Sequence, residues 1–214
     1  GMHRLGIDKN EILDAINIIK NSKLKLKGIY THFCSQDNTQ QKEIFKNIID
    51  TYFYQDKLII HSQASNFINE ELSYCNTIRV GLALYGYNPY LELKPSLRLI
   101  CPIIRIQKIN KDVEVGYDYI EKTPNNGYIL TLPFGYSHGL SRLKTLCFFY
   151  QNKIYYQIGK QCMDMTMFFS KEDIPLEEVE IISSNNTNNL ISLNNENIYY
   201  ILSSLSPNIK RIYK

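Results

Sequence analysis

The spacing of apolar residues changes at about Pro95, and this change limits the folds open to the chain more than any other feature. Before it, segments with helical spacing alternate with short apolar runs. We expect helices over 8–23 and 39–53, a helix start within 62–72, and strands over 24–33, 58–61 and 77–86. Alternation of strand and helix is typical of a parallel α/β architecture.

Beyond Pro95 the helical spacing disappears and strand-like runs take its place. These runs are LRLICPIIRIQKI, GYILTLPF, KTLCFFYQNKIYYQIG and VEIIS, separated by clusters of Gly, Asn and Asp. Such a succession predicts an antiparallel β domain. The Asn-rich segment 183–197 is expected to be a loop, followed by a short helix around 198–202. We therefore predict two domains, an α/β domain over 1–95 and an all-β domain over 96–214.

Composition and charge argue against several classes of function. The formal net charge is +3 over 214 residues, and the lysines are scattered instead of forming a basic stripe, so we expect no nucleic acid as a partner. No apolar run approaches the ~18 residues of a membrane span, and the amino end shows no export signal, so we expect no membrane and a cytoplasmic location. The five cysteines stand far apart without metal-ligand spacing. We expect no metal site, and buried thiols for at least four of them.

Polar residues and glycine follow the predicted parallel strands where these end. The first strand ends near His32, the second is followed by Ser65, and the third contains Arg79 and Gly81. In α/β barrels the reactive groups lie on loops at the carboxyl ends of strands. A serine at a helix start, beside a glycine whose amide is open to approach, suits a phosphate group. Taken singly, each of these residues also fits a structural role, such as a histidine satisfied within the fold or a glycine kept for packing.

Taken in order, eight short motifs resemble those of alanine racemases. They are GMHRLGI, YTHF, HSQAS, RVGLALYG, VGYDY, LPFGYSHGLSR, IGKQCMDM and SSLSPNIKR, and they extend over essentially the whole chain. The resemblance implies an eight-stranded (β/α)8 barrel, of which residues 1–95 would form the carboxyl-side half, followed by the β domain. It implies pyridoxal 5′-phosphate as cofactor and the interconversion of L- and D-alanine, a building block of the bacterial cell wall. It also implies a head-to-tail homodimer in which the β domain of one subunit completes the active site of the other.

The same resemblance implies three catalytic residues. Tyr117 in VGYDY matches the tyrosine that removes or returns the α-proton on one face of the substrate. A phenol with a pKa near ~10 is a poor base at neutral pH, so it needs a neighbour that favours the phenolate. His32 in YTHF matches the histidine that bonds to this tyrosine across the subunit boundary. Arg79 in RVG matches the arginine that faces both the histidine and the ring nitrogen of the cofactor, and a guanidinium there does not give up its proton.

Other motif positions imply the residues that bind cofactor and substrate. Ser65, with the backbone of Gly81 and Leu82, matches the phosphate cradle. Arg4 in GMHRLG matches the arginine near the phenolic oxygen of the cofactor and the substrate carboxylate. Met163 in CMD matches the residue whose amide contacts that carboxylate, although Met163 also fits simple core packing.

The chain departs from the family pattern at three positions. Asp118 stands where glycine usually follows the catalytic tyrosine, which affects the turn that aims Tyr117. His138 replaces the usual aspartate of the corridor that leads to the active site. Pro207 occupies the place where many members carry a tyrosine that bonds to the phosphate, so we expect that contact to be absent.

GMHRLGI resembles the end of a longer family motif that begins with a lysine and an aspartate. The lysine that anchors the cofactor, and serves as base on the opposite face of the substrate, lies further upstream in the family. No lysine here stands in a corresponding motif, so we expect a chain that lacks this segment and does not racemise alone. Two alternatives stay open: a racemase for serine, lysine or a broad set of amino acids, and an inactive remnant that acts only by association with a partner subunit.

Overall fold

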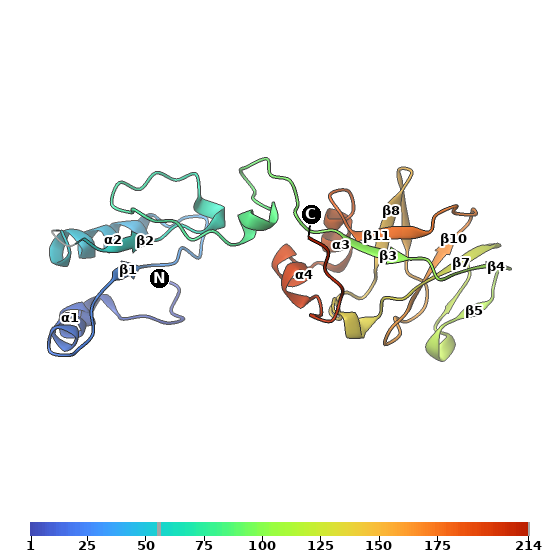
Figure 1. The fold of residues 1–214 in the computed structure, drawn as a ribbon, viewed down its shortest axis with the longest axis horizontal. Coiled ribbons are helices and arrows are strands. Elements are labelled where there is room, and N and C mark those ends of the chain that lie inside the picture. Colours follow the sequence, from blue (N-terminus) through green and yellow to red (C-terminus); the bar gives the residue numbers. More distant parts are fainter. Residues whose placement is uncertain (55–56, 214) are drawn as a thin grey trace. The chain divides into compact units, whose positions relative to one another are not determined.

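Figure 1 shows the computed structural model, which describes residues 1–54 and 57–213. The chain forms two compact units, Gly1–Lys94 and Pro95–Lys214. The elements of the first unit are η1 (Lys9–Glu11), α1 (Ile12–Lys20), β1 (Gly28–Tyr30), α2 (Thr39–Tyr52), β2 (Ile59–His61), η2 (Ser65–Phe67) and η3 (Leu82–Tyr85), where η denotes a 3-10 helix. β1 and β2 pair in parallel, with Gly28 opposite Ile59 and Tyr30 opposite His61.

The first helix of this unit begins at a capping box. The Asp8 carboxylate accepts a hydrogen bond from the amide of Asn10, and the Glu11 carboxylate accepts one from the amide of Asp8. These contacts satisfy amides that a helix start leaves without a partner. None of the side chains of α1 is buried.

The core of the first unit forms where α2 lies against β2. Phe45 and Ile49 stand four residues apart on one face of α2 and are buried with Ile60 of β2. Tyr74 and Cys75, from the segment after η2, pack against the same cluster. The cluster therefore fixes the two parallel strands, whose carboxyl ends lie side by side.

Three expected elements of this unit differ from the structure. The strand predicted over 24–33 is reduced to β1, and the helix start predicted within 62–72 gives only η2. The strand predicted over 77–86 is wrong, because this run contains no strand and ends in η3. The side chain of Ser65 explains the change: its Oγ accepts hydrogen bonds from the amides of Gly81 and Ala83, which are then unavailable to a neighbouring strand.

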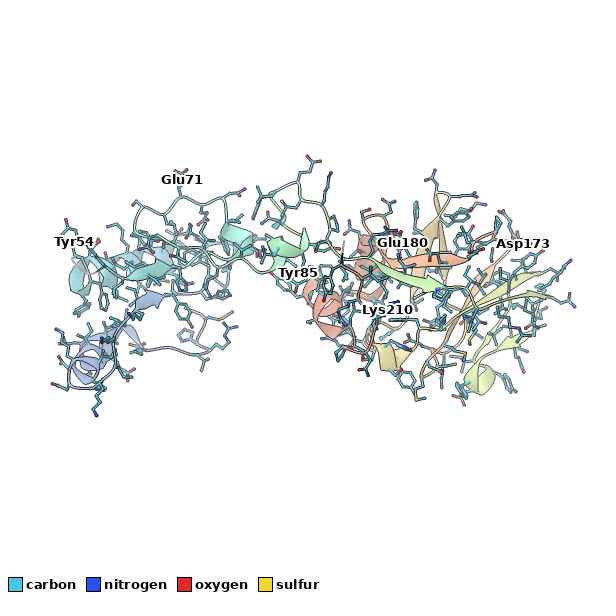
Figure 2. The ribbon with its side chains drawn as sticks, in the orientation of Figure 1. Tyr54, Glu71, Tyr85, Asp173, Glu180 and Lys210 are labelled. Atoms are coloured by element: carbon cyan, nitrogen blue, oxygen red, sulfur yellow. The ribbon has the colours of Figure 1, made fainter. Side chains whose placement is uncertain are left out.

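The second unit is an antiparallel β domain, which confirms that prediction. Its strands are β3 (Leu99–Pro102), β4 (Arg105–Ile109), β5 (Glu114–Val115), β6 (Glu121–Lys122), β7 (Gly127–Leu132), β8 (Cys147–Tyr150), β9 (Lys153–Tyr156), β10 (Thr166–Ser170) and β11 (Glu178–Ile182). β7 lies between β10 and β4, while β11 pairs with β3, β5 with β6, and β8 with β9, all antiparallel. Glu180 of β11, labelled in Figure 2, forms an ion pair with Arg98 just before β3.

The core of the second unit lies between these sheets and its helices. Alternate residues of β10 are buried, as expected for a strand with one face on a core. Leu130, Leu132, Phe148 and Phe168 are fully buried, and the rings of Phe148 and Phe168 lie 5.2 Å apart. This core supports the loops that leave β7 and enter β10.

The Asn-rich segment is a helix in the structure, so the prediction of a loop over 183–197 is wrong. α3 covers Thr187–Asn194 and α4 covers Ile198–Ser204. Leu190 of α3 is fully buried, and the Asn186 amide donates to the backbone oxygens of Cys147 and Ile181 at 2.7 and 2.8 Å. Tertiary packing and these buried hydrogen bonds outweigh the weak helix propensity of asparagine.

Two further expectations are changed by the structure. Cys101 and Cys147 are buried, but Cys34 is exposed and Cys75 and Cys162 are partly exposed, so the expectation of at least four buried thiols is wrong. The chain has an α/β part and a β-rich part, yet no closed barrel is formed within residues 1–54 and 57–213. The assignment of residues 1–95 to half of a barrel stays a prediction. In the described part of the chain, no helix combines the length and apolar character that crossing a membrane requires.

Candidate active site

An arginine–histidine pair lies at the carboxyl ends of β1 and β2. Arg79 Nη2 lies 3.0 Å from Nδ1 of His32, and it donates to the backbone oxygens of Thr31 at 3.0 Å and Ser62 at 3.4 Å. A guanidinium has no acceptor, so Nδ1 of His32 must accept and its proton must reside on Nε2. The structure therefore holds His32 as a neutral imidazole whose Nε2–H points away from Arg79.

A stack of rings supports the arginine of this pair. The guanidinium of Arg79 lies 5.0 Å from the centre of the Tyr30 ring, which itself stacks on the His61 imidazole at 5.0 Å and 11°. Tyr30 and His61 are direct partners in the β1–β2 register. The pairing of the two strands thus sets the platform on which Arg79 rests. Within the described residues, the buried Nε of Arg79 and Nδ1 of His61 have no hydrogen-bond partner.

Burial and charge both favour the neutral form of the two histidines. Burial lowers the pKa of His32, and the charges of Arg79 and Arg4 lower it further. Burial also lowers the pKa of His61, with Arg79 as the second cause. A cationic imidazole next to a permanent cation is unfavourable, so both rings resist protonation.

These pKa shifts predict that the first unit loses stability on acidification. Both folded-state pKa values lie below the ordinary value of 6.5, so the unfolded chain binds more protons than the folded chain once the pH falls below about 6.5. We expect the urea concentration at the midpoint of unfolding of this unit, followed through its amide NMR signals, to decrease when the pH is lowered from 7.5 to 5.5. The double variant His32→Gln, His61→Gln should show a flatter profile, and a midpoint that rises on acidification would contradict the argument.

A buried serine and an open glycine form a second feature of this unit. Ser65 Oγ accepts from the amides of Gly81 at 3.0 Å and Ala83 at 3.1 Å, which leaves its hydroxyl proton free for another acceptor. A Cβ added to Gly81 would meet no atom within 4 Å, so the backbone here borders open space. The amide of Leu82 forms no hydrogen bond within the described residues. Ser65, Gly81 and Leu82, which the sequence predicts as a phosphate cradle, are thus brought together.

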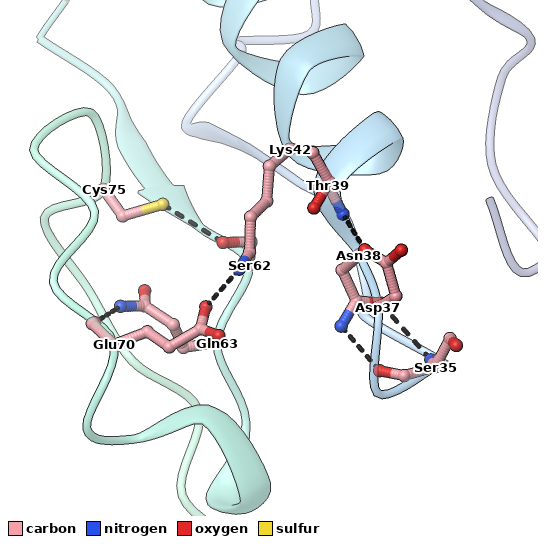
Figure 3. Close-up of polar contacts among 9 residues, drawn as sticks. All are labelled: Ser35, Asp37, Asn38, Thr39, Lys42, Ser62, Gln63, Glu70 and Cys75. Atoms are coloured by element: carbon pink, nitrogen blue, oxygen red, sulfur yellow. Dashed lines mark hydrogen bonds and ion pairs between the residues drawn. The ribbon is translucent and has the colours of Figure 1, made fainter.

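Figure 3 shows the polar contacts of Ser62 and Gln63, which precede Ser65 in the loop after β2. Ser62 is fully buried with its Oγ 3.3 Å from Cys75 Sγ, and the Gln63 side-chain amide donates to the backbone oxygen of Glu70 at 2.6 Å. Lys42 of α2 forms an ion pair with the Glu70 carboxylate at 2.8 Å. These contacts restrict Ser62 and Gln63, the first residues of the loop after β2.

Tyr117 lies on a strained and exposed turn of the second unit. Its side chain is 66% exposed and it opens η4 (Tyr117–Tyr119). Asp118, which departs from the family pattern, adopts φ 59°, a left-handed conformation that asparagine and aspartate tolerate better than most residues. The Asp118 carboxylate also forms an ion pair with Lys160. That pair connects the VGYDY turn to the IGKQ motif.

Met163 lies in a loop that the structure joins to the LPFGYSHG motif. Met163 is 58% exposed, and its backbone oxygen accepts from the amide of Ser137 at 2.9 Å. A Cβ on Gly135 would lie 2.4 Å from backbone atoms of Cys162, Met163 and Asp164, so only glycine fits this crossing. The alternative that Met163 packs in a core does not agree with the structure, because Met163 is mostly exposed.

Two remaining departures have structural roles in the second unit. His138 Nδ1 accepts from the amide of Gly135 at 3.1 Å, and its ring stacks on Phe134 at 5.5 Å. The backbone oxygen of Pro207 accepts from Arg211 at 3.1 Å. Arg4 is exposed in the segment before η1, and its charge contributes to the low pKa of His32.

Sequence reasoning missed the residues that support the pair. Tyr30 and His61 reach it by stacking, and Gln41 of α2 donates to Thr31 Oγ1 at 2.7 Å and to the His32 backbone oxygen at 2.9 Å. The position of His61 at the end of a predicted strand indicates a possible site residue. Gln41 lies on a helix next to a second glutamine, and nothing in its sequence context indicates a role in the site.

The fold and these features define a two-domain protein, with an α/β part that carries a candidate anion cradle and an antiparallel β domain. Residues 1–89 match the family described as "Alanine racemase, N-terminal domain", and residues 96–213 match "Alanine racemase, C-terminal domain". The chain belongs to the alanine racemase family.

Individual relatives agree with this assignment. The alanine racemase of Rickettsia bellii is 32% identical, over 100% of this chain and 56% of that protein. The alanine racemase of Staphylococcus saprophyticus is 28% identical, over 100% of this chain and 61% of that protein. A solved alanine racemase from Clostridium difficile 630 has a TM-score of 0.89 at 25% identity, covering 100% of this chain and 62% of that one. The chain thus spans about half to three fifths of the length of such relatives.

Proposed function

We propose that this chain is part of a pyridoxal phosphate-dependent alanine racemase, which interconverts L- and D-alanine as a homodimer with shared active sites. The observation that carries the proposal is the Arg79–His32 contact at the strand ends, in the same unit as the Ser65 cradle. Family membership supplies the reaction class, and these residues supply the groups that the reaction needs.

The residues present fit the cofactor. Its ring nitrogen is an acceptor, and Arg79 Nε is a buried donor without a partner in the described part of the chain. Its phosphate needs donors beside open space, which the hydroxyl proton of Ser65 and the amide of Leu82 provide, while Gly81, whose own amide bonds to Ser65, leaves the approach open. When bound, the cofactor supplies an electron sink for the carbanion formed at the α-carbon of the substrate.

The chain's own residues have distinct tasks in this proposal. Arg79 keeps its proton, so a ring nitrogen that faces it stays unprotonated. His32, neutral and with Nε2–H turned away from Arg79, links this arginine to the phenol of Tyr117 of a second copy. Tyr117 Oη removes or returns the α-proton on one face of alanine. Arg4 and the amide of Met163 bind the substrate carboxylate.

We also propose that the chain does not racemise alanine by itself. None of its lysines lies in a motif that resembles the cofactor-anchoring lysine of the family. The described parallel pair β1–β2 is also far smaller than the eight strands of a barrel. Without that lysine, one face of the α-carbon has no base.

The test is a racemase assay on two proteins. One is this chain, and the other is a fusion that adds the part of the R. bellii alanine racemase to which the chain does not align. Formation of D-alanine by the fusion but not by the chain supports both proposals. A fusion that folds, binds pyridoxal phosphate and racemises another amino acid faster than alanine would overturn the substrate assignment. Turnover by the chain alone would overturn the argument about the lysine.

Ser65→Ala is expected to weaken the binding of pyridoxal phosphate to the fusion. The substitution removes one hydrogen bond to a charged group and releases the two amides that Ser65 Oγ holds in place. A loss of about 1.5–3 kcal/mol corresponds to an increase in Kd of roughly 10- to 150-fold, measured by absorbance titration. Ser62→Ala is the matched control, because Ser62 is as deeply buried in the same loop but contacts Cys75 instead. Equal losses in the two variants would argue against the cradle.

A further inference from the structure

The side chain of Gln41 reaches from α2 to the segment that carries His32. Its Nε2 donates to Thr31 Oγ1 at 2.7 Å and to the His32 backbone oxygen at 2.9 Å. Gln41 is partly buried and lies four residues before Phe45, which anchors α2 in the core. The donor group is therefore carried by a helix that is itself fixed.

Arg79 approaches the same two residues with a separate set of contacts. Its Nη2 donates to the Thr31 backbone oxygen and lies 3.0 Å from the His32 ring. Thr31 and His32 are thus contacted at four atoms, two by Gln41 and two by Arg79. The strand β1 ends at Tyr30, and the Thr31 amide still bonds to β2, through the backbone oxygen of His61 at 3.2 Å.

The contacts of Gln41 differ in kind from those of Arg79. Arg79 holds the ring of His32, whereas Gln41 holds the backbone from which the ring projects. A ring contact alone leaves the backbone of a loop residue free to move, so the ring distance to Arg79 depends on a second anchor. The amide of Gln41 supplies that anchor with both of its hydrogens, a task that neither a carboxylate nor a thioether can perform.

Gln41 also lies against the segment that contains Arg4. A Cβ built on Gly1 would lie 2.6 Å from Gln41 Cδ, so the start of GMHRLG passes close to this side chain. Arg4 and Arg79 are the two charged groups whose fields act on His32. Gln41 thus lies between the segments that carry His32 and Arg4.

We propose that Gln41 is a positioning residue that holds His32 against Arg79. The proposal rests on the proposed function only for the catalytic role of His32. The contact between His32 and Arg79 needs neither cofactor nor substrate. When Gln41 is lost, the backbone of Thr31–His32 moves away from α2 and the imidazole separates from the guanidinium.

The experiment follows the imidazole signals of His32 and His61 by NMR during a pH titration of the full chain. Three proteins are compared: the wild type, Gln41→Met and Gln40→Met. Methionine has nearly the length of glutamine but no donor. Gln40 precedes Gln41 on the same helix and is exposed, and its side chain forms no hydrogen bond within the described residues, so its variant is the matched control. Far-UV circular dichroism verifies that each variant retains the helices.

We expect Gln41→Met to raise the pKa of His32 towards its usual value, because the ring leaves Arg79 and enters water. The pKa of His61, which also faces Arg79 but does not touch Gln41, should stay unchanged, and Gln40→Met should leave both unchanged. An unchanged pKa of His32 in Gln41→Met would overturn the proposal. Equal shifts of both histidines would overturn it too, because they indicate a general loosening of the unit. Should Gln41→Met not fold, Gln41→Leu, which offers no donor to the His32 oxygen and adds no charge, is judged by the same comparison. These outcomes are independent of whether the fusion racemises alanine.

Discussion

Tyr117→Phe is expected to lower the rate of alanine racemisation by the fusion roughly 100- to 10,000-fold, the range usual for loss of a general acid–base group. The substitution removes only the phenolic oxygen, which has no hydrogen bond to any described residue of this chain and is carried by a 66% exposed side chain. Folding should therefore be unaffected, while one face of the α-carbon loses its proton acceptor. Initial rates of D-alanine formation from L-alanine, and of the reverse reaction, measure the effect.

Tyr119→Phe is a closely matched control for this prediction. Tyr119 belongs to the same turn and is likewise 66% exposed. If the turn only needs aromatic rings at its surface, the two variants will behave alike. A Tyr117→Phe enzyme that retains the wild-type rate, or a Tyr119→Phe enzyme that loses as much, would remove Tyr117 from the catalytic role.

Phe168→Ala is expected to lower the free energy of unfolding of the second unit by about 3–5 kcal/mol, as for other fully buried aromatic residues. Phe168 is fully buried at the centre of β10, and its ring lies 5.2 Å from that of Phe148. Its removal leaves a cavity next to several other fully buried side chains. β10 begins two residues after Asp164, so a loosened strand should also disturb the Met163 loop. Urea unfolding, followed by near-UV circular dichroism, measures the loss.

Phe169→Ala provides the comparison on the same strand. Phe169 points to the opposite face and is only partly buried, beside the smaller cluster of Val115, Ile129 and Ile158. We expect a clearly smaller loss, because less apolar surface returns to water and the site can relax. A loss for Phe169→Ala equal to that for Phe168→Ala would indicate that the two faces of β10 do not differ as described.

The sequence predicted elements well where a local pattern coincided with tertiary packing. α2 falls within one residue of the predicted helix, because its apolar face meets β2, and the β-rich character of the second unit followed from its strand-like runs. Prediction failed where a distant partner decides the structure. Ser65 draws the amides of residues 81 and 83 out of a strand, and the buried contacts of Asn186 begin a helix in an Asn-rich segment.

The candidate site shows the same division. Motif order selected His32, Arg79 and Ser65, and the structure places His32 beside Arg79 and Ser65 beside the Gly81 amide. Their roles stay predictions. Tyr30 and Gln41 could not be selected, because one appears as a strand residue and the other as a surface residue of a helix. Tyr30 matters because its ring lies against the guanidinium of Arg79, and Gln41 because its side chain forms hydrogen bonds with Thr31 and His32. Both contacts form only when the chain is folded.

The backbone crossing at Gly135 limits how this protein can evolve. There is no space for even a methyl group between Gly135 and the Cys162–Asp164 loop, so a change in the backbone of one loop requires a change in the other. A length change in either loop would have to be matched in the other, and recombination with a homologue is tolerated only if both come from the same parent. A chimera made by recombination with a homologue should therefore exchange residues 133–139 and 160–165 together.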